Sequence, residues 1–217
     1  GITGDFKPHD WYVSWGTIKE RVWQTTKLME QGRALKVLNL GCGNSLVAEA
    51  VVDDPKAKIE KVVSIDFIES VIRAQEERVK DVTRFKDKLE FRTMDVLNMN
   101  DLSEGSFDLV IDKGTVDSLL TTSSGAADFE TACKQISRVL RPGGWLVMVS
   151  CAIGYAQIKP LQNLTHFKWK VAQVSEMPSD VNDDTKINLL LIKRLDEKEL
   201  QQAMEEALQK TQASSSK

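Results

Sequence analysis

Short apolar runs alternate with segments of helical periodicity through the central part of the chain. The runs are rich in β-branched residues and apolar on both faces, which is typical of strands buried in a parallel sheet. They predict strands at 35–40, 61–65, 89–93, 107–111 and 145–150.

Helical patterns separate these predicted strands. Apolar residues recur at helical spacing in 68–80 and again in 129–140, which Pro142 follows and ends. Ser45 is expected to cap a helix over 45–52, because serine side chains satisfy the free amides at helix starts. Strands that alternate with helices predict right-handed crossovers and a doubly wound parallel sheet.

The pattern changes after the fifth predicted strand. The apolar runs 167–174 and 186–192 have no helix between them, only the turn-rich acidic segment 178–184, and so predict an antiparallel hairpin. The whole pattern predicts an α/β fold with a doubly wound seven-stranded sheet, mostly parallel, that ends in an antiparallel hairpin. We expect one domain over 1–194, in which 1–34 form an N-terminal aromatic cap and helix.

A last helix is predicted beyond this domain, over 195–212. Leu200, Met204 and Leu208 form an apolar stripe along it, four residues apart. We expect this stripe to dock on the chain's own domain in preference to a partner. The segment 213–217 is expected to be a disordered tail.

Composition narrows the classes of partner. The formal net charge is −3, so the chain has no basic surplus to neutralise nucleic-acid phosphates. The cysteines Cys42, Cys133 and Cys151 fit neither a disulfide framework nor a zinc site. The histidines His9 and His166 lie far apart, so we expect no metal centre.

We therefore expect reduced thiols and a cytoplasmic protein with no nucleic-acid partner. No apolar run approaches the roughly 18 residues of a membrane span, so no membrane association is expected. A mitochondrial location stays open, because a targeting segment is removed from a mature protein. Nothing in the sequence specifies an oligomeric state.

Candidate chemistry begins where the first predicted strand ends, at Gly41-Cys42-Gly43-Asn44-Ser45. Glycines here permit positive φ and let a ligand approach the backbone. Asp66 and Asp95 end the second and third predicted strands, and Val96 follows with a backbone amide. Each aspartate alone is a common turn residue. Because the carboxyl ends of parallel strands share one edge of the sheet, the three features together predict a nucleotide cleft.

The glycine loop favours S-adenosylmethionine over a dinucleotide. The dinucleotide fingerprint has a third glycine where this chain has Leu46, and no basic residue for phosphate lies nearby. S-adenosylmethionine carries no phosphate, so neither departure obstructs it. The turn at 142–144 and the terminal hairpin agree with this interpretation.

Four segments resemble the methyltransferase-like protein-lysine methyltransferases, whose members modify elongation factor 1-alpha or mitochondrial citrate synthase. They are the glycine loop segment 38–45, the stretch Asp112-Lys113-Gly114-Thr115-Val116-Asp117 within 111–120, the aromatic segment Asp10-Trp11-Tyr12 with Trp15, and 137–144. The second of these is far more specific than the glycine loop. The resemblance covers about Asp10 to Lys193.

The resemblance implies a set of contacts to S-adenosylmethionine and its product S-adenosylhomocysteine. It places Trp11, Gly41, Asp66, Phe67, Asp95, Val96 and Lys113 at the cofactor. We add Tyr12 and Trp15 from the same aromatic cluster as Trp11, and Cys42, Gly43 and Asn44 from the glycine loop. The family's upstream Tyr-Trp pair is not found in these residues, either because the sequence starts too late to include it or because it has diverged. Asn39 stands where many methyltransferases carry an acidic residue.

The fourth predicted strand ends where the transferred methyl group is expected to emerge, so Asp112, Lys113 and Asp117 are the candidate catalytic residues. Methyl transfer to a lysine requires a neutral amine, whose reference pKa is about 10.4. Desolvation or a neighbouring cation lowers that pKa, and a carboxylate can orient the amine. The alternative for Asp117 is a solvated residue in the first turn of a helix.

Three functions stay open at this point. The first is a methyltransferase for a lysine of a folded protein such as elongation factor 1-alpha. For this function, the acidic segment 180–184 is either a contact for a basic partner or a solvated turn. The second is a small-molecule methyltransferase. The third is a catalytically silent binding module, against which the strand-end aspartates argue.

Overall fold

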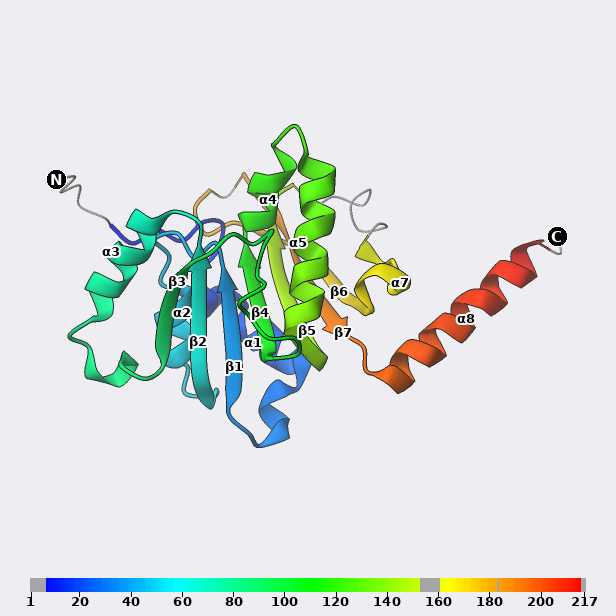
Figure 1. Ribbon diagram of the computed structural model, residues 1–217, viewed down its shortest axis with the longest axis horizontal. Helices are drawn as coiled ribbons and strands as arrows, with labels where there is room; N and C mark the ends of the chain where they lie inside the picture. Colours follow the sequence, from blue (N-terminus) through cyan, green and yellow to red (C-terminus); the bar gives the residue numbers. More distant parts are fainter. Residues whose placement is uncertain (1–6, 153–160, 183, 216–217) are drawn as a thin grey trace.

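The computed structural model describes residues 7–152, 161–182 and 184–215. These residues form a seven-stranded sheet flanked by helices (Figure 1). The strands are β1 (Leu35–Leu40), β2 (Ile59–Asp66), β3 (Leu89–Thr93), β4 (Phe107–Lys113), β5 (Leu140–Ser150), β6 (Trp169–Pro178) and β7 (Lys186–Arg194). The helices are α1 (Trp15–Thr26), α2 (Val47–Val52), α3 (Glu69–Val79), α4 (Thr115–Leu120), α5 (Gly125–Val139), α7 (Leu164–Phe167) and α8 (Glu197–Ser215), with 3-10 turns η1 (Leu28–Gln31) and η2 (Thr83–Phe85).

The strand order is β3-β2-β1-β4-β5-β7-β6. Strands β1 to β5 pair in parallel, whereas β7 runs antiparallel to both β5 and β6. The predicted fold class is confirmed. Because β1 lies between β2 and β4, the order reverses at this point, and open α/β sheets bind ligands beyond the strand ends at such a switch point.

Helices cover both faces of the sheet. Leu38 and Leu40 of β1 face a cluster to which α5 contributes Phe129 and Ile136. Val37, directly before Leu38 on the strand, faces the opposite cluster, which α1 and α2 cover. This alternation follows from the two-residue period of a strand. Both faces of the sheet are therefore buried, and a ligand can reach the sheet only at the ends of its strands.

Several element boundaries differ from the sequence prediction. Helix α2 begins at Val47, because the Ser45 hydroxyl accepts from the Val47 amide at 3.2 Å from outside the helix. Strand β5 begins at Leu140, which pairs with Phe107. Helix α4 is separate from α5, which starts at Gly125 and not near residue 129.

Helix α8 extends away from the sheet (Figure 1). Met204 is 40% exposed and Leu208 is 62% exposed, so the expected docking of the stripe on its own domain is wrong. The helix also runs to Ser215, into the segment expected to be disordered, and residues 216–217 lie outside the described part. Its turns carry glutamine–glutamate pairs four residues apart, which stabilise a solvated helix. Among the described residues, no helix combines the length and apolarity needed to cross a membrane.

Candidate active site

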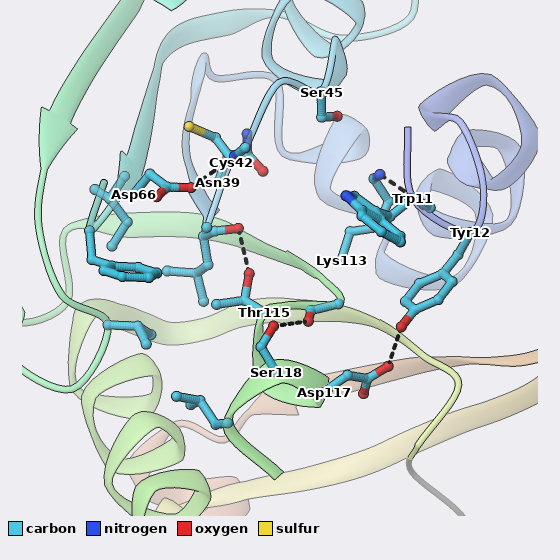
Figure 2. A pocket seen from close by; sticks show the side chains of 18 of the residues that line it. Trp11, Tyr12, Asn39, Cys42, Ser45, Asp66, Lys113, Thr115, Asp117 and Ser118 are labelled. Carbon is cyan, nitrogen blue, oxygen red and sulfur yellow. Dashed lines mark hydrogen bonds between the residues drawn. The ribbon is translucent and has the colours of Figure 1, made fainter. Parts of the chain in front are cut away.

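A cavity of about 480 Å³ opens at the carboxyl ends of the strands around β1 (Figure 2). Its walls come from the loop after β1, the ends of β2 and β4, the residues after β3 and β5, and an N-terminal segment at Trp11 and Tyr12. The predicted site residues that line it are Trp11, Tyr12, Gly41, Cys42, Gly43, Asp66, Phe67, Asp95, Val96, Lys113 and Asp117. The switch point of the sheet thus gathers residues from distant parts of the chain into one cavity.

The glycine loop keeps its backbone bare toward this cavity. Gly41 and Gly43 have φ of +48° and +49°, a conformation that disfavours any side chain. A Cβ on Gly41 would lie 2.2 Å from the Thr115 Oγ1 atom. That hydroxyl donates to the Leu40 carbonyl at 3.0 Å, so it is held in place. The loop therefore fits a ligand that lies close against backbone, and only glycine fits position 41.

Carboxylates mark the next strand ends. Asp66 accepts from the Gly43 amide at 3.0 Å and from the Ile68 amide at 3.0 Å, so it ties the glycine loop to β2. Its side chain lines the cavity, and a carboxylate keeps acceptor sites beyond two amide bonds. Asp95 accepts from the Leu97 amide at 2.8 Å. Both carboxylates thus remain able to accept from hydroxyl or amino groups of a bound nucleoside.

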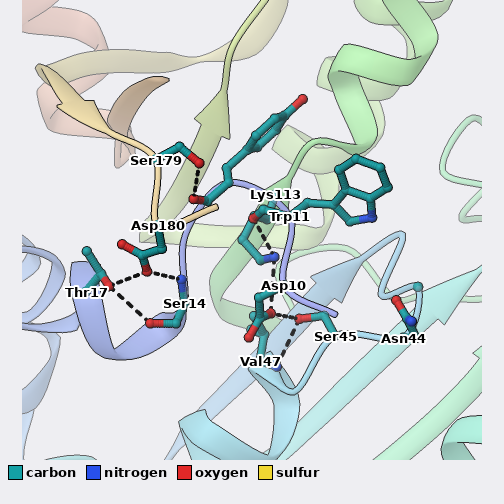
Figure 3. A network of polar contacts seen from close by, with 12 residues as sticks. Asp10, Trp11, Ser14, Thr17, Asn44, Ser45, Val47, Lys113, Ser179 and Asp180 are labelled. Carbon is teal, nitrogen blue, oxygen red and sulfur yellow. Dashed lines mark hydrogen bonds and ion pairs between the residues drawn. The ribbon is translucent and has the colours of Figure 1, made fainter. Parts of the chain in front are cut away.

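The N-terminal segment Asp10–Ser14, which we call the strap, crosses the strand ends (Figure 3). The Lys113 Nζ donates to the Trp11 carbonyl at 2.9 Å and pairs with the Asp10 carboxylate at 3.2 Å. The Tyr12 carbonyl accepts from the Asp180 amide at 2.7 Å and from the Ser179 hydroxyl at 2.6 Å. The strap is thus anchored to β4 and to the loop between β6 and β7.

Lys113 is buried beside the cavity, with 6% of its side chain exposed. Burial lowers the pKa of its ammonium, and the nearby Asp10 carboxylate opposes that shift. Both of its contacts are to the strap. The structure therefore places Lys113 where predicted, with its ammonium engaged in holding Asp10 and Trp11.

Asp117 is 6% exposed, so the alternative of a solvated helix residue is wrong. It accepts from the Tyr12 hydroxyl at 2.9 Å, from the Cys151 amide at 2.8 Å and from the Ser150 hydroxyl. Burial, together with the Cys151 thiol and the Asp117 carboxylate, raises the pKa of Tyr12 above its ordinary range. The Tyr12 side chain is therefore a neutral phenol at neutral pH.

Three predicted site residues do not line the cavity. Asp112 is wholly buried, and its Oδ1 accepts from the Val116 amide at 3.3 Å, so a direct catalytic role for it is wrong. Burial and the neighbouring Asp117 raise the pKa of Asp112 to about 7. Its carboxyl points into the domain because neighbouring positions on β4 face opposite sides.

The other two residues that do not line the cavity, Trp15 and Asn44, were predicted to contact the cofactor. Trp15 is 2% exposed and packs in the core, where its Nε1 donates to Asp54 at 3.2 Å, as does the Nε1 of Trp23 at 3.0 Å. Asn44 donates through its side chain to the Lys7 carbonyl, away from the cavity. Neither residue is in reach of a ligand in the cavity. The acidic loop is also less free than expected, since Asp180 accepts from the Ser14 amide and the Thr17 hydroxyl.

Some cavity residues were absent from the predicted set. They are Asn39, Leu40, Ser45, Ile65, Met94, Gly114, Thr115, Ser118, Leu119, Thr121, Cys151 and Ala152. Cys151 and Ala152 follow the fifth predicted strand directly, so the strand-end rule that found Asp66 was available for them too. Thr115, Ser118 and Leu119 of α4 lie in the stretch 111–120 that carries the family resemblance, so a signal was available for them as well.

The fold, the bare glycine loop and the strand-end carboxylates define a class I S-adenosylmethionine-dependent methyltransferase. The chain belongs to the methyltransferase domain family, whose sequence model matches residues 31–212. S-adenosylmethionine is the cofactor of this enzyme.

Curated relatives and a solved structure agree with that class. The chain is 31% identical over 138 residues to the eEF1A lysine and N-terminal methyltransferase of Bos taurus, covering 63% of this chain and 19% of that protein's length. It is 23% identical over 200 residues to the mitochondrial citrate synthase-lysine N-methyltransferase of Danio rerio, covering 79% and 78% of the two chains. A SAM-dependent methyltransferase structure from Methanosarcina mazei shares the fold, with a TM-score of 0.61 and 16% identity over 87% of this chain and 100% of that one. The chain thus spans about a fifth of the bovine relative.

Proposed function

We propose that this methyltransferase modifies a lysine side chain of a protein, with elongation factor 1-alpha as the leading candidate substrate. The observation that carries the proposal is the buried Asp117 bonded to Tyr12 on the far side of Thr115 from Asp66 (Figure 2). The cavity thus holds Asp66 on the side proposed for the cofactor and the Tyr12–Asp117 pair on the side proposed for the acceptor. The relatives named for lysine methylation support the choice of acceptor.

The residues that line the cavity fall into a group for the cofactor and a group for the methyl acceptor. Gly41 and Gly43 would hold the cofactor against bare backbone, and Asp66 would accept from its ribose hydroxyls. Asp95 would accept from the adenine amino group, to which Val96 would add its backbone amide. When bound, S-adenosylmethionine supplies a methyl group whose C–S bond breaks, with the electron pair going to sulfur, as the acceptor nitrogen forms the new N–C bond.

The acceptor amine has to be neutral before it reacts. A lysine in water has a pKa near 10.4, and removal from water lowers it. The partly closed cavity supplies that desolvation, and the released proton goes to water at the cavity mouth. Orientation of the nitrogen along the line of the C–S bond then accounts for much of the rate enhancement.

The rim of the cavity favours a large acceptor over a small metabolite. Trp11 is 60% exposed and Phe67 is 73% exposed, so aromatic surface faces outward beside the opening. Exposed aromatic rings at a rim are typical of surfaces that contact another protein. The three free cysteines support a reducing compartment such as the cytoplasm.

The test is direct labelling. The enzyme is incubated with radiolabelled S-adenosylmethionine and, separately, with recombinant elongation factor 1-alpha, recombinant citrate synthase or cell extract. Label on a lysine of elongation factor 1-alpha, located by mass spectrometry, is the expected result. Label confined to small metabolites would overturn the proposal. Binding of S-adenosylhomocysteine with no label on any protein or metabolite would instead favour a silent module.

A further inference from the structure

The backbone of Tyr12 is held in an unfavourable conformation. Its φ of 66° lies in the left-handed region, which aromatic residues seldom adopt and which costs energy. The carbonyl of the same residue is fixed by the Asp180 amide and the Ser179 hydroxyl. Such strain persists only where the surroundings enforce it, and it turns the Tyr12 side chain into the cavity, away from the path of the strap.

The ring of Tyr12 packs against the backbone of Gly114. A Cβ on Gly114 would lie 3.0 Å from the Tyr12 Cε2 atom, so the ring packs against bare backbone. The φ of Gly114 is +85°, which a side chain would also oppose. The glycine between Lys113 and Thr115 thus makes room for this ring and sets where its hydroxyl lies.

That hydroxyl stands in front of Asp117. The Asp117 carboxylate binds three donors, with the Ser150 hydroxyl on Oδ1 and the Tyr12 hydroxyl and Cys151 amide on Oδ2. It is buried, whereas Tyr12 is half-buried at the cavity. The Cys151 Sγ lies 3.1 Å from the Tyr12 hydroxyl oxygen and, because the phenol proton goes to Asp117, its thiol donates to one lone pair of that oxygen. The other lone pair stays available, and a phenol that donates its proton to a carboxylate becomes a better acceptor.

We infer that Tyr12 is a catalytic residue on the acceptor side of the cavity, whose phenolic oxygen accepts a hydrogen bond from the N–H of the acceptor amine. Asp117 is the positioning residue behind it, and orients the phenol. This inference deepens the proposed function and rests on it for the identity of the acceptor as an amine. It moves Tyr12 from the cofactor set predicted from the sequence to the acceptor set.

The protonation states of Tyr12 and of the acceptor amine determine which of them donates and which accepts. The raised pKa of Tyr12 keeps its proton on the phenol, in the bond to Asp117, so Tyr12 is not the base. The amine loses its proton to water and keeps an N–H for the Tyr12 oxygen. Its lone pair then points away from that bond, toward the cofactor side of the cavity.

The test compares Tyr12→Phe with Thr25→Val. Tyr12→Phe keeps the ring on Gly114 and removes the hydroxyl. Thr25→Val removes a hydroxyl that makes one hydrogen bond of 2.9 Å, to Gln173, on a helix outside the site. The probe is n-butylammonium, a lysine side-chain mimic, added with S-adenosylhomocysteine and followed by saturation-transfer NMR. We expect transfer to the probe in the wild type and Thr25→Val, and loss of transfer in Tyr12→Phe.

A kinetic readout accompanies the binding probe. On elongation factor 1-alpha, kcat of Tyr12→Phe should fall roughly 10- to 100-fold, with the Kd for S-adenosylhomocysteine changed less than about 2-fold, because only the acceptor is misplaced. If Tyr12→Phe does not fold, Asp117→Asn replaces it. That variant keeps a partner for the hydroxyl, lacks the charge, and should weaken butylammonium binding.

The outcomes separate the two proposals. A wild type that labels no protein but binds butylammonium through Tyr12 would refute the proposed function and support this inference. Equal probe binding in Tyr12→Phe and the wild type would overturn the inference alone. So would a wild type that binds S-adenosylhomocysteine but not the probe.

Discussion

The Nζ of Lys113 donates to the carbonyl of Trp11 at 2.9 Å, across 102 positions of the sequence. This bond joins the end of β4 to the strap, and the ion pair with Asp10 reinforces it. Lys113 thus acts on the cavity through the strap that it holds. Two other residues of the stretch 112–117 also hold the strap: Gly114 packs against the ring of Tyr12, and Asp117 accepts from its hydroxyl.

Lys113→Met therefore tests the anchoring of the strap. The methionine keeps the length of the side chain but leaves Asp10 without its cation and the Trp11 carbonyl without its donor. We expect the Kd for S-adenosylhomocysteine, measured by calorimetric titration, to rise roughly tenfold, the effect of losing about 1.4 kcal/mol. An unchanged Kd would show that the strap holds its position without Lys113.

Trp11 and Trp15 offer a matched pair. Trp11→Ala removes an exposed ring at the rim, so it should weaken binding of S-adenosylhomocysteine while the unfolding free energy of the apo protein changes by less than about 1 kcal/mol. Trp15→Ala empties a core position and leaves Asp54 with one donor fewer, at a cost of about 3–5 kcal/mol. Urea unfolding and calorimetry on both variants measure the contrast. Unchanged cofactor affinity in Trp11→Ala would remove that ring from the site.

Gly41 and Gly43 share a positive φ but differ in their surroundings. Alanine at either position pays the left-handed penalty of roughly 1–2 kcal/mol. At position 41 the new Cβ also meets the Thr115 hydroxyl at 2.2 Å, whereas at position 43 the nearest atom is 3.9 Å away. We expect Gly41→Ala to lower Tm more than Gly43→Ala. Equal losses in thermal unfolding would show that Thr115 moves aside freely.

Asp112 predicts a pH dependence of stability. Its pKa rises from an ordinary 3.8 to about 7 on folding, so between these values the folded protein holds a proton that the unfolded chain has lost. The resulting stability is fully present below about pH 4 and is lost as the pH rises through about 7. In Asp112→Asn, the fall in unfolding free energy from about pH 5 to pH 8 should be about 2 kcal/mol smaller than in the wild type. Parallel profiles in urea titrations would contradict this.

Helix α8 predicts an effect of truncation. Ending the chain after Leu200 keeps Glu199, which pairs with Lys193, and removes only the projecting turns. Because most of the described side chains in those turns are exposed, Tm and the Kd for S-adenosylhomocysteine should stay within the error of measurement. A fall in Tm of more than about 5 °C would show that α8 packs against another surface in solution.

The features predicted correctly from the sequence are the sheet, which follows from the hydrophobic period, and the site residues that directly follow a strand. Asp66 and Asp95 were placed in the cavity because the carboxyl ends of parallel strands converge. Asp112 was misplaced because adjacent strand residues face opposite sides, and the sequence does not say which side holds the ligand. The apolar face of α8 was visible, but amphipathicity does not say what covers it.

The strap shows where sequence information was weakest. The turn that points Tyr12 into the cavity and sends Trp15 to the core occurs at a non-glycine residue with positive φ. Nothing in the residue type marks such a turn. The hydrogen bonds that enforce it come from Ser179 and Asp180, at the other end of the chain.

That distant anchor has a consequence for biosynthesis. Tyr12 is synthesised well before Ser179 and Asp180, the residues in the loop between β6 and β7 that hold its carbonyl. A nascent chain that has completed β5 carries the glycine loop and the strand-end carboxylates but has no means of fixing the strap over them. The active site is therefore finished only when the terminal hairpin docks, so a ribosome that stalls before it yields an open, inactive sheet.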